Sequence, residues 1–364
     1  MSRPTIAEIN LLALKKNVKK LKKITRSKIY PVVKANAYGH GLKRVIETIN
    51  NYISGYCVAT FEESIELRRL TSKSIVCMEG PYNLLELKNL EKLNIDYVIH
   101  SNRQISFLEE IKSSDLSGNN KIWLKIDTGM NRLGFKENEI FKAFKKIISF
   151  KKKIVLMSHF SSASANTKAK KQSNKQIKLF KKYESKLKKI KPNLLSSLCN
   201  SGGLINFKNS HMGISRPGIS IFGCQEDLGM SSLDLEQVMT LKSKFISIKK
   251  VKKGELVGYE GTWRAKKDTK VGILPIGYAD GYPTGMGNSA YVLVDNKKAK
   301  VIGRVSMDLT AVDLSRCVQA NFNSEVILWG SNLKIDKVAK FSNTISYELM
   351  TSLSKRVKRK YIEK

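Results

Sequence analysis

The sequence predicts an α/β protein: a (β/α)8 barrel of the TIM type, followed by a mostly β C-terminal domain. Two observations lead to this prediction. Short apolar runs of strand character alternate with amphipathic helical segments through roughly the first two-thirds of the chain, which is typical of parallel strands covered by helices. After about Leu235 the alternation stops, and strand-like runs punctuated by Gly, Asp and Asn follow. We therefore predict a barrel at residues 1–235 and a β domain at residues 236–364.

Eight candidate strands support the barrel. A helix comes first, because apolar residues recur at nearly helical spacing at Ile9, Leu12, Leu14, Val18 and Leu21. The strands follow at residues 29–35 and near Cys57, Val76, Val98, Leu124, Leu156, Leu198 and Ile221. Helical patterns separate most of them, for example at residues 62–70, 84–93 and 168–190. Eight such units favour a barrel over a doubly wound open sheet, which usually has fewer strands and whose glycine fingerprint is missing.

The C-terminal part is predicted to be mostly β. Its strand-like runs are separated by tight turns, such as GYADGYPTGMG at residues 277–287. A helical tail, basic on one side, is predicted at residues 349–362. No low-complexity linker separates the two parts, so we expect the domains to pack tightly.

Composition narrows the class of protein. With 364 residues, 41% hydrophobic and 27% charged, the chain is expected to fold as a soluble protein with sizeable cores. No apolar run approaches the length of a membrane span, and the N-terminus lacks the order of a signal peptide. The five cysteines are scattered singly, without metal-ligand spacing or a disulfide framework. We therefore expect a protein of the reducing cytoplasm with no metal site.

The net charge of +35 raises the question of an anionic partner. The excess is mostly lysine, spread over the solvent faces of predicted helices, as at residues 142–146 and 181–183. No recognition motif accompanies it, and aromatic residues are not interleaved with the basic runs as a stacking platform requires. We expect a solvated surface with no specific nucleic acid and no membrane partner, and at most a weak, salt-sensitive affinity for polyanions.

One lysine is a candidate catalytic residue. Residues 29–41 (IYPVVKANAYGHG) place Lys34 where an apolar run gives way to polar and glycine residues. A lysine at the end of a strand often only extends its amine into water. A partly desolvated amine, however, is a better nucleophile and can form an imine with an aldehyde. We therefore expect Lys34 to be partly desolvated and reactive.

The polar residues that follow the predicted strands gather at one end of the barrel. Active sites of such barrels lie at the carboxyl ends of the strands. The residues that follow the predicted strands are Lys34 and Tyr38, residues 127–132, His159, Asn200 with Ser201, and Arg216. Two late loops, CNSGG at residues 199–203 and RPGIS at residues 216–220, offer hydroxyl groups, glycines and free amides. These loops favour a bound phosphate at this end.

Several separated motifs resemble those of alanine racemases. In chain order they are VVKANAYGHG (32–41), KIDTGMNRLGF (125–135), SHF (158–160) with CNSGG (199–203), SRPGISIFG (215–223), VGYEGTW (257–263), LPIGYADGYP (274–283), GRVSMDL (303–309) and ISYELM (345–350). One such match would be weak, but together they follow the family's order over nearly the whole chain. The resemblance implies a barrel that binds pyridoxal 5'-phosphate, joined to a β domain.

The resemblance assigns the chemistry to two bases. Lys34 would carry the cofactor and act as one base, and Tyr259 would act as the second base on the opposite face. To invert a stereocentre, a proton must leave one face of the α-carbon and return on the other, which two groups achieve better than one. In the family this tyrosine reaches the lysine of the other subunit, so a homodimer with shared active sites is implied. Without the resemblance, Tyr259 would be interpreted as an ordinary strand tyrosine.

Other motif positions imply contacts with cofactor and substrate. Arg216 would meet the ring nitrogen and, because arginine stays protonated, would keep that nitrogen unprotonated. His159 would pack against the ring, although a lone histidine is more often a core or loop residue. The phosphate would be held by Tyr38, Ser201, Gly218, Ile219 and Tyr347. The substrate side would be formed by Arg132 and Met307, with Tyr278 and Asp308 near the entrance.

Some further positions would support or orient these residues without contacting the substrate. Lys125 matches a lysine that can be carbamylated in this family and then supports the arginine Arg132. Ser197 stands where some relatives have a histidine, and we expect it to orient Arg216 less firmly. Asn131 and Phe135 also stand where many relatives have other residues.

We therefore predict a racemase that interconverts L-alanine and D-alanine and supplies D-alanine for peptidoglycan. Three alternatives stay open: a racemase of broader specificity for serine, lysine or arginine, a protein that binds pyridoxal phosphate without catalysis, and a basic nucleic-acid-binding protein on a barrel scaffold. Tyr347 near the substrate entrance favours a small side chain. A non-catalytic protein would have no reason to keep the β domain and Tyr259.

Overall fold

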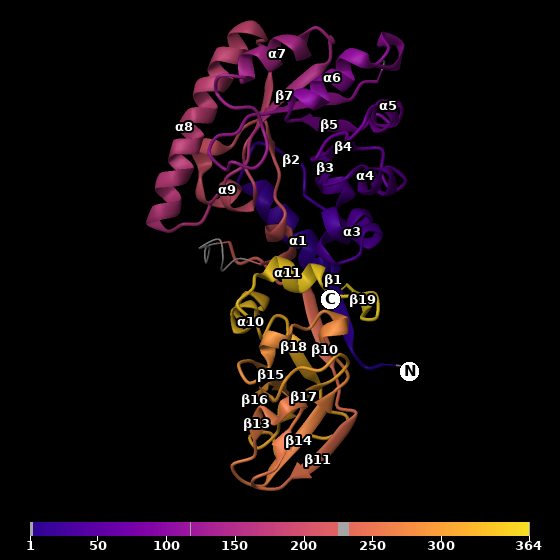
Figure 1. The fold of residues 1–364 in the computed structure, drawn as a ribbon, viewed down its shortest axis with the longest axis vertical. Coiled ribbons are helices and arrows are strands. Elements are labelled where there is room, and N and C mark those ends of the chain that lie inside the picture. Colours follow the sequence, from indigo (N-terminus) through magenta and orange to yellow (C-terminus); the bar gives the residue numbers. More distant parts are fainter. Residues whose placement is uncertain (1–2, 117, 225–232, 364) are drawn as a thin grey trace.

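The computed structural model describes residues 3–116, 118–224 and 233–363. Figure 1 shows two domains stacked along the long axis of the molecule, one with helices around a parallel sheet and one built mostly of strands. Figure 1 places α11 and the C-terminal end of the chain near the junction of the two domains. No helix of the described residues combines the length and the apolar character needed to cross a membrane.

Eight parallel strands form the sheet of the first domain. They are β2 (Lys28–Ile29), β3 (Gly55–Val58), β4 (Ser74–Cys77), β5 (Asp96–Ile99), β6 (Lys121–Lys125), β7 (Lys153–Met157), β8 (Leu195–Ser197) and β9 (Ile214–Ser215). Their order in the sheet is β2-β9-β8-β7-β6-β5-β4-β3. A parallel bridge between Val32 and Cys57 joins the two ends of this order, so the sheet closes. The predicted (β/α)8 barrel is confirmed.

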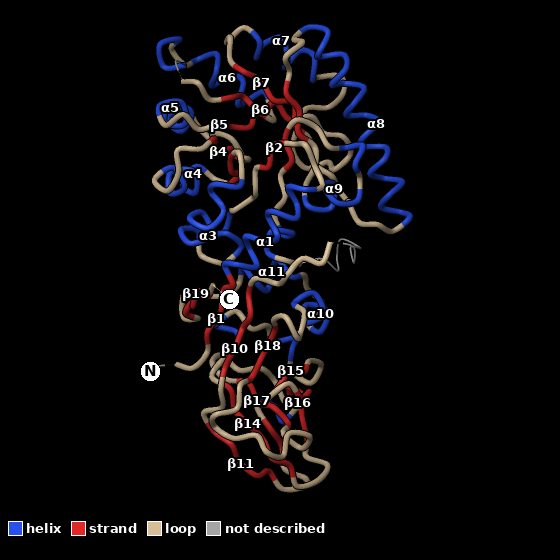
Figure 2. Tube along the Cα trace, turned by 180° about the vertical axis from the view of Figure 1, so that it is seen from behind, coloured by secondary structure: helices blue, strands red, loops and turns tan. Residues whose placement is uncertain are grey.

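Helices surround the barrel strands, as the view from behind shows (Figure 2). They are α1 (Leu11–Lys23), α3 (Leu42–Ile49), α4 (Phe61–Arg68), α5 (Leu84–Lys92), α6 (Asn102–Glu110), α7 (Ile140–Ile148), α8 (Thr167–Ile190) and α9 (Ser201–Asn206). In α1 the buried residues include Leu14, Val18 and Leu21, which repeat at helical spacing and face the core. The helix begins at Leu11 rather than at Ile9, because the residues before it form a strand.

The first barrel strand is shorter than predicted. The sequence predicts a strand at residues 29–35, but β2 ends at Ile29 and Val32 forms only an isolated bridge. Pro31 interrupts the run because proline has no N–H to give to the sheet. A helical turn, α2 (Lys34–Tyr38), then begins at the predicted catalytic lysine.

The eighth barrel strand lies earlier in the chain than predicted. The apolar run near Ile221 is not a strand but a short 3-10 helix, Ile219–Phe222. The strand that completes the barrel is β9, which ends just before Arg216. Pro217 follows it, and a proline limits strand pairing on either side.

The second domain is built on a nine-stranded sheet. In addition to β1 (Ile6–Asn10), its strands are β10 (Met239–Ser243), β11 (Ser247–Val251), β14 (Thr269–Leu274), β15 (Tyr291–Val294), β16 (Lys297–Ile302), β17 (Thr310–Asp313), β18 (Val326–Trp329) and β19 (Lys358–Ile362). Their order is β11-β14-β17-β16-β15-β18-β10-β1-β19. A small separate pair is formed by β12 (Leu256–Val257) and β13 (Trp263–Arg264). Residues 6–10, which the boundary at residue 235 assigns to the barrel, thus lie in this sheet.

The predicted helical tail at residues 349–362 is wrong. Of this segment only residues 349–351 are helical, as the end of α11 (Ser346–Thr351), which follows α10 (Ile335–Phe341); residues 358–362 form β19. β19 pairs in parallel with β1 and forms the edge strand of the sheet. Three consecutive basic residues, Lys358, Arg359 and Lys360, begin this strand.

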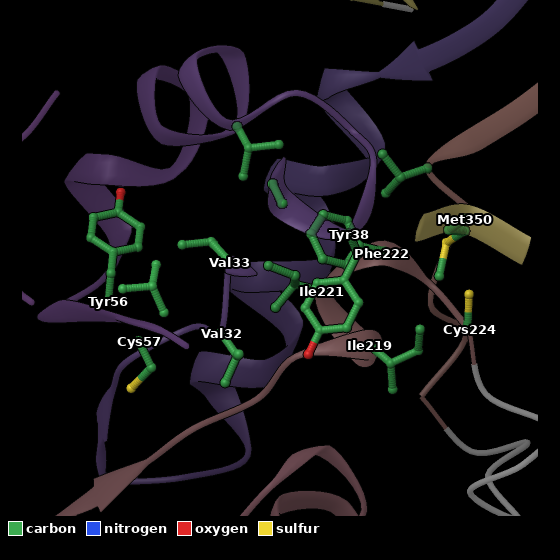
Figure 3. Packing of buried hydrophobic residues seen from close by; sticks show 14 of the residues in the cluster. Val32, Val33, Tyr38, Tyr56, Cys57, Ile219, Ile221, Phe222, Cys224 and Met350 are labelled. Carbon is green, nitrogen blue, oxygen red and sulfur yellow. The ribbon is translucent and has the colours of Figure 1, made fainter. Parts of the chain in front are cut away.

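A continuous apolar core connects the barrel to the segment after Lys34. Figure 3 shows Val32 and Val33 beside Cys57, with Tyr38 packed next to Phe222. The ring centroids of Tyr38 and Phe222 are 5.4 Å apart. Because protein cores are densely packed, this contact fixes the position of the turn that follows Lys34.

Candidate active site

A cavity of about 370 Å³ lies where the barrel strands end. Nine predicted site residues line it: Lys34, Tyr38, Arg132, His159, Ser201, Arg216, Gly218, Ile219 and Tyr347. Eight of them come from segments that follow barrel strands, which meet because the carboxyl ends of parallel strands lie on one side of the barrel. The ninth, Tyr347, comes from α11. The described residues that line the cavity do not include the other four predicted site residues, which are Tyr259, Tyr278, Met307 and Asp308.

Lys34 begins a turn with an uncommon backbone. The four residues after it, Ala35 to Tyr38, all have φ between 51° and 53°, the left-handed region. Each such residue costs roughly 1–2 kcal/mol when it is not glycine. Surrounding contacts stabilise the turn: Ala35 N donates to a Glu63 carboxylate oxygen at 2.6 Å, and Asn36 Oδ1 accepts from Leu42 N at 2.7 Å. Backbone strain that the surroundings maintain is frequent at functional sites.

The side chain of Lys34 is more exposed than the sequence suggests. It lines the cavity but is exposed to solvent in the single chain. The expectation of a partly desolvated amine is therefore wrong for one chain alone.

A hydroxyl group organises the end of the cavity near α9. Ser201 Oγ accepts hydrogen bonds from Gly218 N at 2.9 Å and from Ser220 N at 3.2 Å. A Cβ atom on Gly218 would lie 2.7 Å from Tyr38 Oη, so only glycine leaves this space open. Burial raises the pKa of Tyr38 above its usual value, which keeps its phenol able to donate. Converging hydroxyl and amide groups of this kind suit a phosphate.

Arg216 is buried and held by the barrel wall. Its Nη2 donates to the carbonyl oxygen of Ser158 at 2.6 Å, and its Nη1 donates to Ser197 Oγ. Ser197 in turn donates to the carbonyl oxygen of Ile214 at 2.8 Å. The serine therefore does orient Arg216, although the sequence suggests weaker support there. Within the described chain no acidic side chain pairs with Arg216. Its charge is thus available to a ligand.

Positive charge is concentrated around the cavity. Four cationic side chains and one carboxylate line it: Lys34, Lys125, Arg132, Arg216 and Glu79. Burial, followed by the charges of Arg216 and Arg132, lowers the pKa of Lys125 to about 8. Burial and the same cations lower the pKa of His159 to about 3, so its ring is neutral at physiological pH. The cavity thus favours an anionic ligand.

The loop that carries Arg132 is fixed by one carboxylate. Asp127 Oδ1 accepts from the backbone N–H groups of Gly129, Met130 and Asn131 at 2.9, 3.0 and 3.1 Å. Its other oxygen lies 2.7 Å from Lys136 Nζ. Burial alone would raise the pKa of Asp127, but these hydrogen bonds lower it overall.

Some lining residues are absent from the sequence-based prediction. They are Val32, Ala59, Met78, Glu79, Leu133 and Met157. Ala59 directly follows β3, and Met78 and Glu79 follow β4. The carboxyl-end rule that selects Lys34 and His159 also applies to these positions. Glu79 is the notable omission, because it is the one carboxylate of the cavity among the described residues.

The predicted residues of the β domain form a separate, exposed group. Tyr259 is 69% exposed and lies between β12 and β13, and Figure 1 labels β13 in the lower domain. Tyr278 N donates to Ser306 O at 3.1 Å and Ala279 N donates to Met307 O at 3.0 Å, so these two segments lie side by side. The structure thus brings Tyr278 and Met307 together but does not place Tyr259 in the cavity of its own chain.

Comparisons with known proteins agree with this architecture. Residues 9–226 match the family model of the alanine racemase N-terminal domain, and residues 238–361 match the model of the C-terminal domain. The chain is 38% identical to the alanine racemase of Actinobacillus succinogenes, over 99% of this chain and 100% of the relative. It is 36% identical to that of Haemophilus influenzae, over 99% of both chains.

Solved structures give the same result. The crystal structure of the biosynthetic alanine racemase from Pseudomonas aeruginosa has a TM-score of 0.89 and 33% identity, and the match covers 99% of this chain and 100% of that one. The alanine racemase from Bartonella henselae, a crystal structure with covalently bound pyridoxal phosphate, has a TM-score of 0.90 and 26% identity over 99% of both chains. This chain therefore belongs to the alanine racemase family and is a racemase enzyme that acts on alanine.

Proposed function

We propose that the chain uses pyridoxal 5'-phosphate to interconvert L-alanine and D-alanine with two bases, Lys34 and Tyr259 of the partner subunit. The observation that carries the proposal is the meeting of Lys34, Arg216 and the hydroxyl groups of Tyr38 and Ser201 in one cationic cavity at the carboxyl ends of the barrel strands.

The residues of the cavity fit the cofactor. Its volume of about 370 Å³ lies within the range of roughly 300–1,000 Å³ that is typical of small-ligand sites. At one end, the missing Cβ of Gly218 leaves space beside Tyr38 Oη and Ser201 Oγ for the phosphate. Lys34 opens into the same cavity, where its amine can hold the aldehyde carbon. His159, being neutral, can pack against a ring without adding charge.

The chain's own residues would divide the work of racemisation. When bound, the cofactor supplies an electron-withdrawing ring that stabilises negative charge at the substrate α-carbon. Arg216, which lines the cavity, would donate to the ring nitrogen and limit that electron withdrawal, which suits a reaction that must only move one proton. Arg132 is positioned to pair with the substrate carboxylate. Lys34 would exchange the α-proton on one face and Tyr259 of the partner subunit on the other.

Exposed side chains on the β domain support a second copy as the partner. Around Tyr259 and its neighbouring loops, the large apolar side chains of Leu256, Tyr278, Met307 and Leu309 are each more than 40% exposed. A group of such residues on a soluble chain favours a protein interface. A homodimer in which Tyr259 reaches the partner's cavity would cover these residues and would also shield Lys34 from water.

Two variants and one assay test the proposal. The purified protein is expected to carry a visible absorption band that borohydride treatment removes, and to racemise L-alanine. Lys34→Ala should lose both the band and the activity. Tyr259→Phe should keep the band and lose racemisation, because the cofactor is held by the barrel residues. Full racemase activity of Tyr259→Phe, or a colourless active wild type, would contradict the proposal.

The same assay addresses the alternatives. A panel of L-serine, L-lysine and L-arginine alongside L-alanine separates an alanine enzyme from one of broad specificity. A coloured protein that racemises none of them would support cofactor binding without catalysis. For the biological role, we propose a cytoplasmic supply of D-alanine for peptidoglycan. Growth of a D-alanine auxotroph on expression of the chain tests it, and failure of an active enzyme to restore growth counts against it.

A further inference from the structure

A buried carboxylate lies directly behind the exposed residues Tyr278 and Met307. Asp280 has no exposed surface, and it lies two residues after Tyr278. Arg3 donates to both of its oxygens, with Nη2 to Oδ2 at 2.8 Å, and Gly277 N donates to Oδ2 at 2.9 Å. Arg356 adds a fourth contact, with Nε 3.5 Å from Oδ1. The cavity residues described above do not include any of these groups.

The same two arginines also bind the neighbouring loop. Arg356 Nη2 donates to Asp308 Oδ1 at 2.6 Å, and Arg3 Nη2 donates to the carbonyl oxygen of Asp308 at 3.1 Å. Each arginine therefore contacts both Asp280 and Asp308. We refer to Arg3, Asp280, Asp308 and Arg356 as the Asp280 cluster. It joins the two loops that carry Tyr278 and Met307.

The backbones around the Asp280 cluster are packed too closely to shift freely. A Cβ atom on Gly277 would lie 2.1 Å from the carbonyl oxygen of Ser306, and one on Gly281 would lie 2.3 Å from that of Ser352. Ser354 N also donates to the carbonyl oxygen of Asp280 at 3.1 Å. The turn at residues 277–281 is thus held from three parts of the chain: the N-terminus, the loop at residues 306–309 and the segment after α11.

We propose that Asp280, Arg3 and Arg356 are positioning residues for the substrate-facing side chain of Tyr278 and the backbone of Met307. This inference rests on the proposed function, in which Tyr278 and Met307 complete the cavity of the partner subunit. Removing one arginine leaves the buried carboxylate of Asp280 with half of its cationic partners. The turn then loses its fixed place relative to Asp308. Because a displacement of about 1 Å in a reacting geometry can reduce turnover on the order of a hundredfold, the effect should appear in catalysis.

Arg356→Gln is the variant of choice, because its side chain is 46% exposed and its loss endangers folding less than loss of Asp280. The control is Lys250→Gln, which breaks an exposed ion pair with Asp268 at 2.8 Å in the same domain. Both are purified as holoenzymes and compared with the wild type in cofactor content, dimer content and steady-state kinetics with L-alanine. Amide hydrogen exchange of residues 277–282 and 305–309 is measured on the same samples.

The expected result is specific to the substrate side. Arg356→Gln should lower kcat/KM by about tenfold or more, with KM raised more than kcat is lowered, and with unchanged cofactor and dimer content. In Arg356→Gln the amide hydrogens of residues 277–282 and 305–309 should exchange faster than in the wild type. Arg356→Lys should recover part of the lost kcat/KM, and Lys250→Gln should match the wild type in both measurements. Kinetics within twofold of the wild type, or unchanged exchange in the two loops, would overturn the proposal. A wild type without racemase activity would instead overturn the proposed function, and loop exchange would still decide whether the cluster positions the loops.

Discussion

Replacing Lys125 by methionine should stabilise the protein, and more so at neutral than at alkaline pH. Lys125 is 7% exposed and has no acid bonded to its amine within the described residues, while Arg216 and Arg132 repel it. These causes lower its pKa from 10.5 to about 8. Methionine has a similar length and no charge, so it removes the cost of keeping a cation in this place.

The size of this stabilisation and its pH dependence follow from the difference in proton binding between the folded and unfolded states. Between pH 8 and 10.5 the unfolded chain keeps the proton of Lys125 and the folded chain releases it, so the unfolded state binds more protons and stability rises with pH. Below pH 8 the full penalty is present, and lowering the pKa from 10.5 to about 8 corresponds to about 3 kcal/mol. Lys125→Met should therefore raise the free energy of unfolding by about 3 kcal/mol at pH 7 and by about half of that at pH 9.5.

Urea unfolding of both cofactor-free proteins at these two pH values, at one protein concentration, measures the difference. Buffers should be free of bicarbonate, because family resemblance implies that Lys125 can be carbamylated, and a carbamate would reverse its charge. The comparison with the variant cancels the titration of the many surface lysines. An equal difference at both pH values, or a more stable wild type at pH 7, would refute the reasoning that Lys125 is a strained cation.

Two further substitutions test the cavity. Gly218→Ala should weaken binding of pyridoxal phosphate by about tenfold or more, because the new Cβ would lie 2.7 Å from Tyr38 Oη and overpacking typically costs about 1–3 kcal/mol. An absorbance titration that shows unchanged affinity for pyridoxal phosphate would contradict the proposal that Gly218 leaves space for the phosphate. Ser197→Ala should destabilise the fold by about 1–3 kcal/mol, because a buried N–H of Arg216 loses its acceptor. A urea midpoint equal to that of the wild type would show that water replaces the serine.

Much of the site on the barrel could be predicted from the sequence, because its residues follow local signals. Lys34, His159 and Arg216 come after apolar runs, and the ends of parallel strands meet in one place regardless of the details of each strand. The same rule, applied to every strand, would also have selected Glu79 after β4. The resemblance to alanine racemases added Gly218 and the phosphate-binding role of Ser201, because that role depends on backbone amides that a sequence pattern does not display.

The segments that the sequence missed depend on contacts with distant parts of the chain. The basic segment at residues 358–362 has no local feature that separates a helix from a strand, and it is a strand because it pairs with β1, more than 300 residues earlier. Similarly, the apolar run near Ile221 has strand composition, but the barrel already has its eighth strand at β9. The left-handed turn after Lys34 is stabilised in part by Glu63, which lies outside the motif.

The shared active site is tested most directly by mixing two inactive variants. Lys34→Ala and Tyr259→Phe are unfolded together, refolded as a mixture and assayed for racemisation of L-alanine. If Lys34 of one subunit works with Tyr259 of the other, a mixed dimer has one intact site and one site without either base. Random pairing in a symmetric dimer should then restore about a quarter of the wild-type activity. Mixed dimers that form, as shown by differently tagged subunits, but remain inactive would contradict the two-base, two-subunit site.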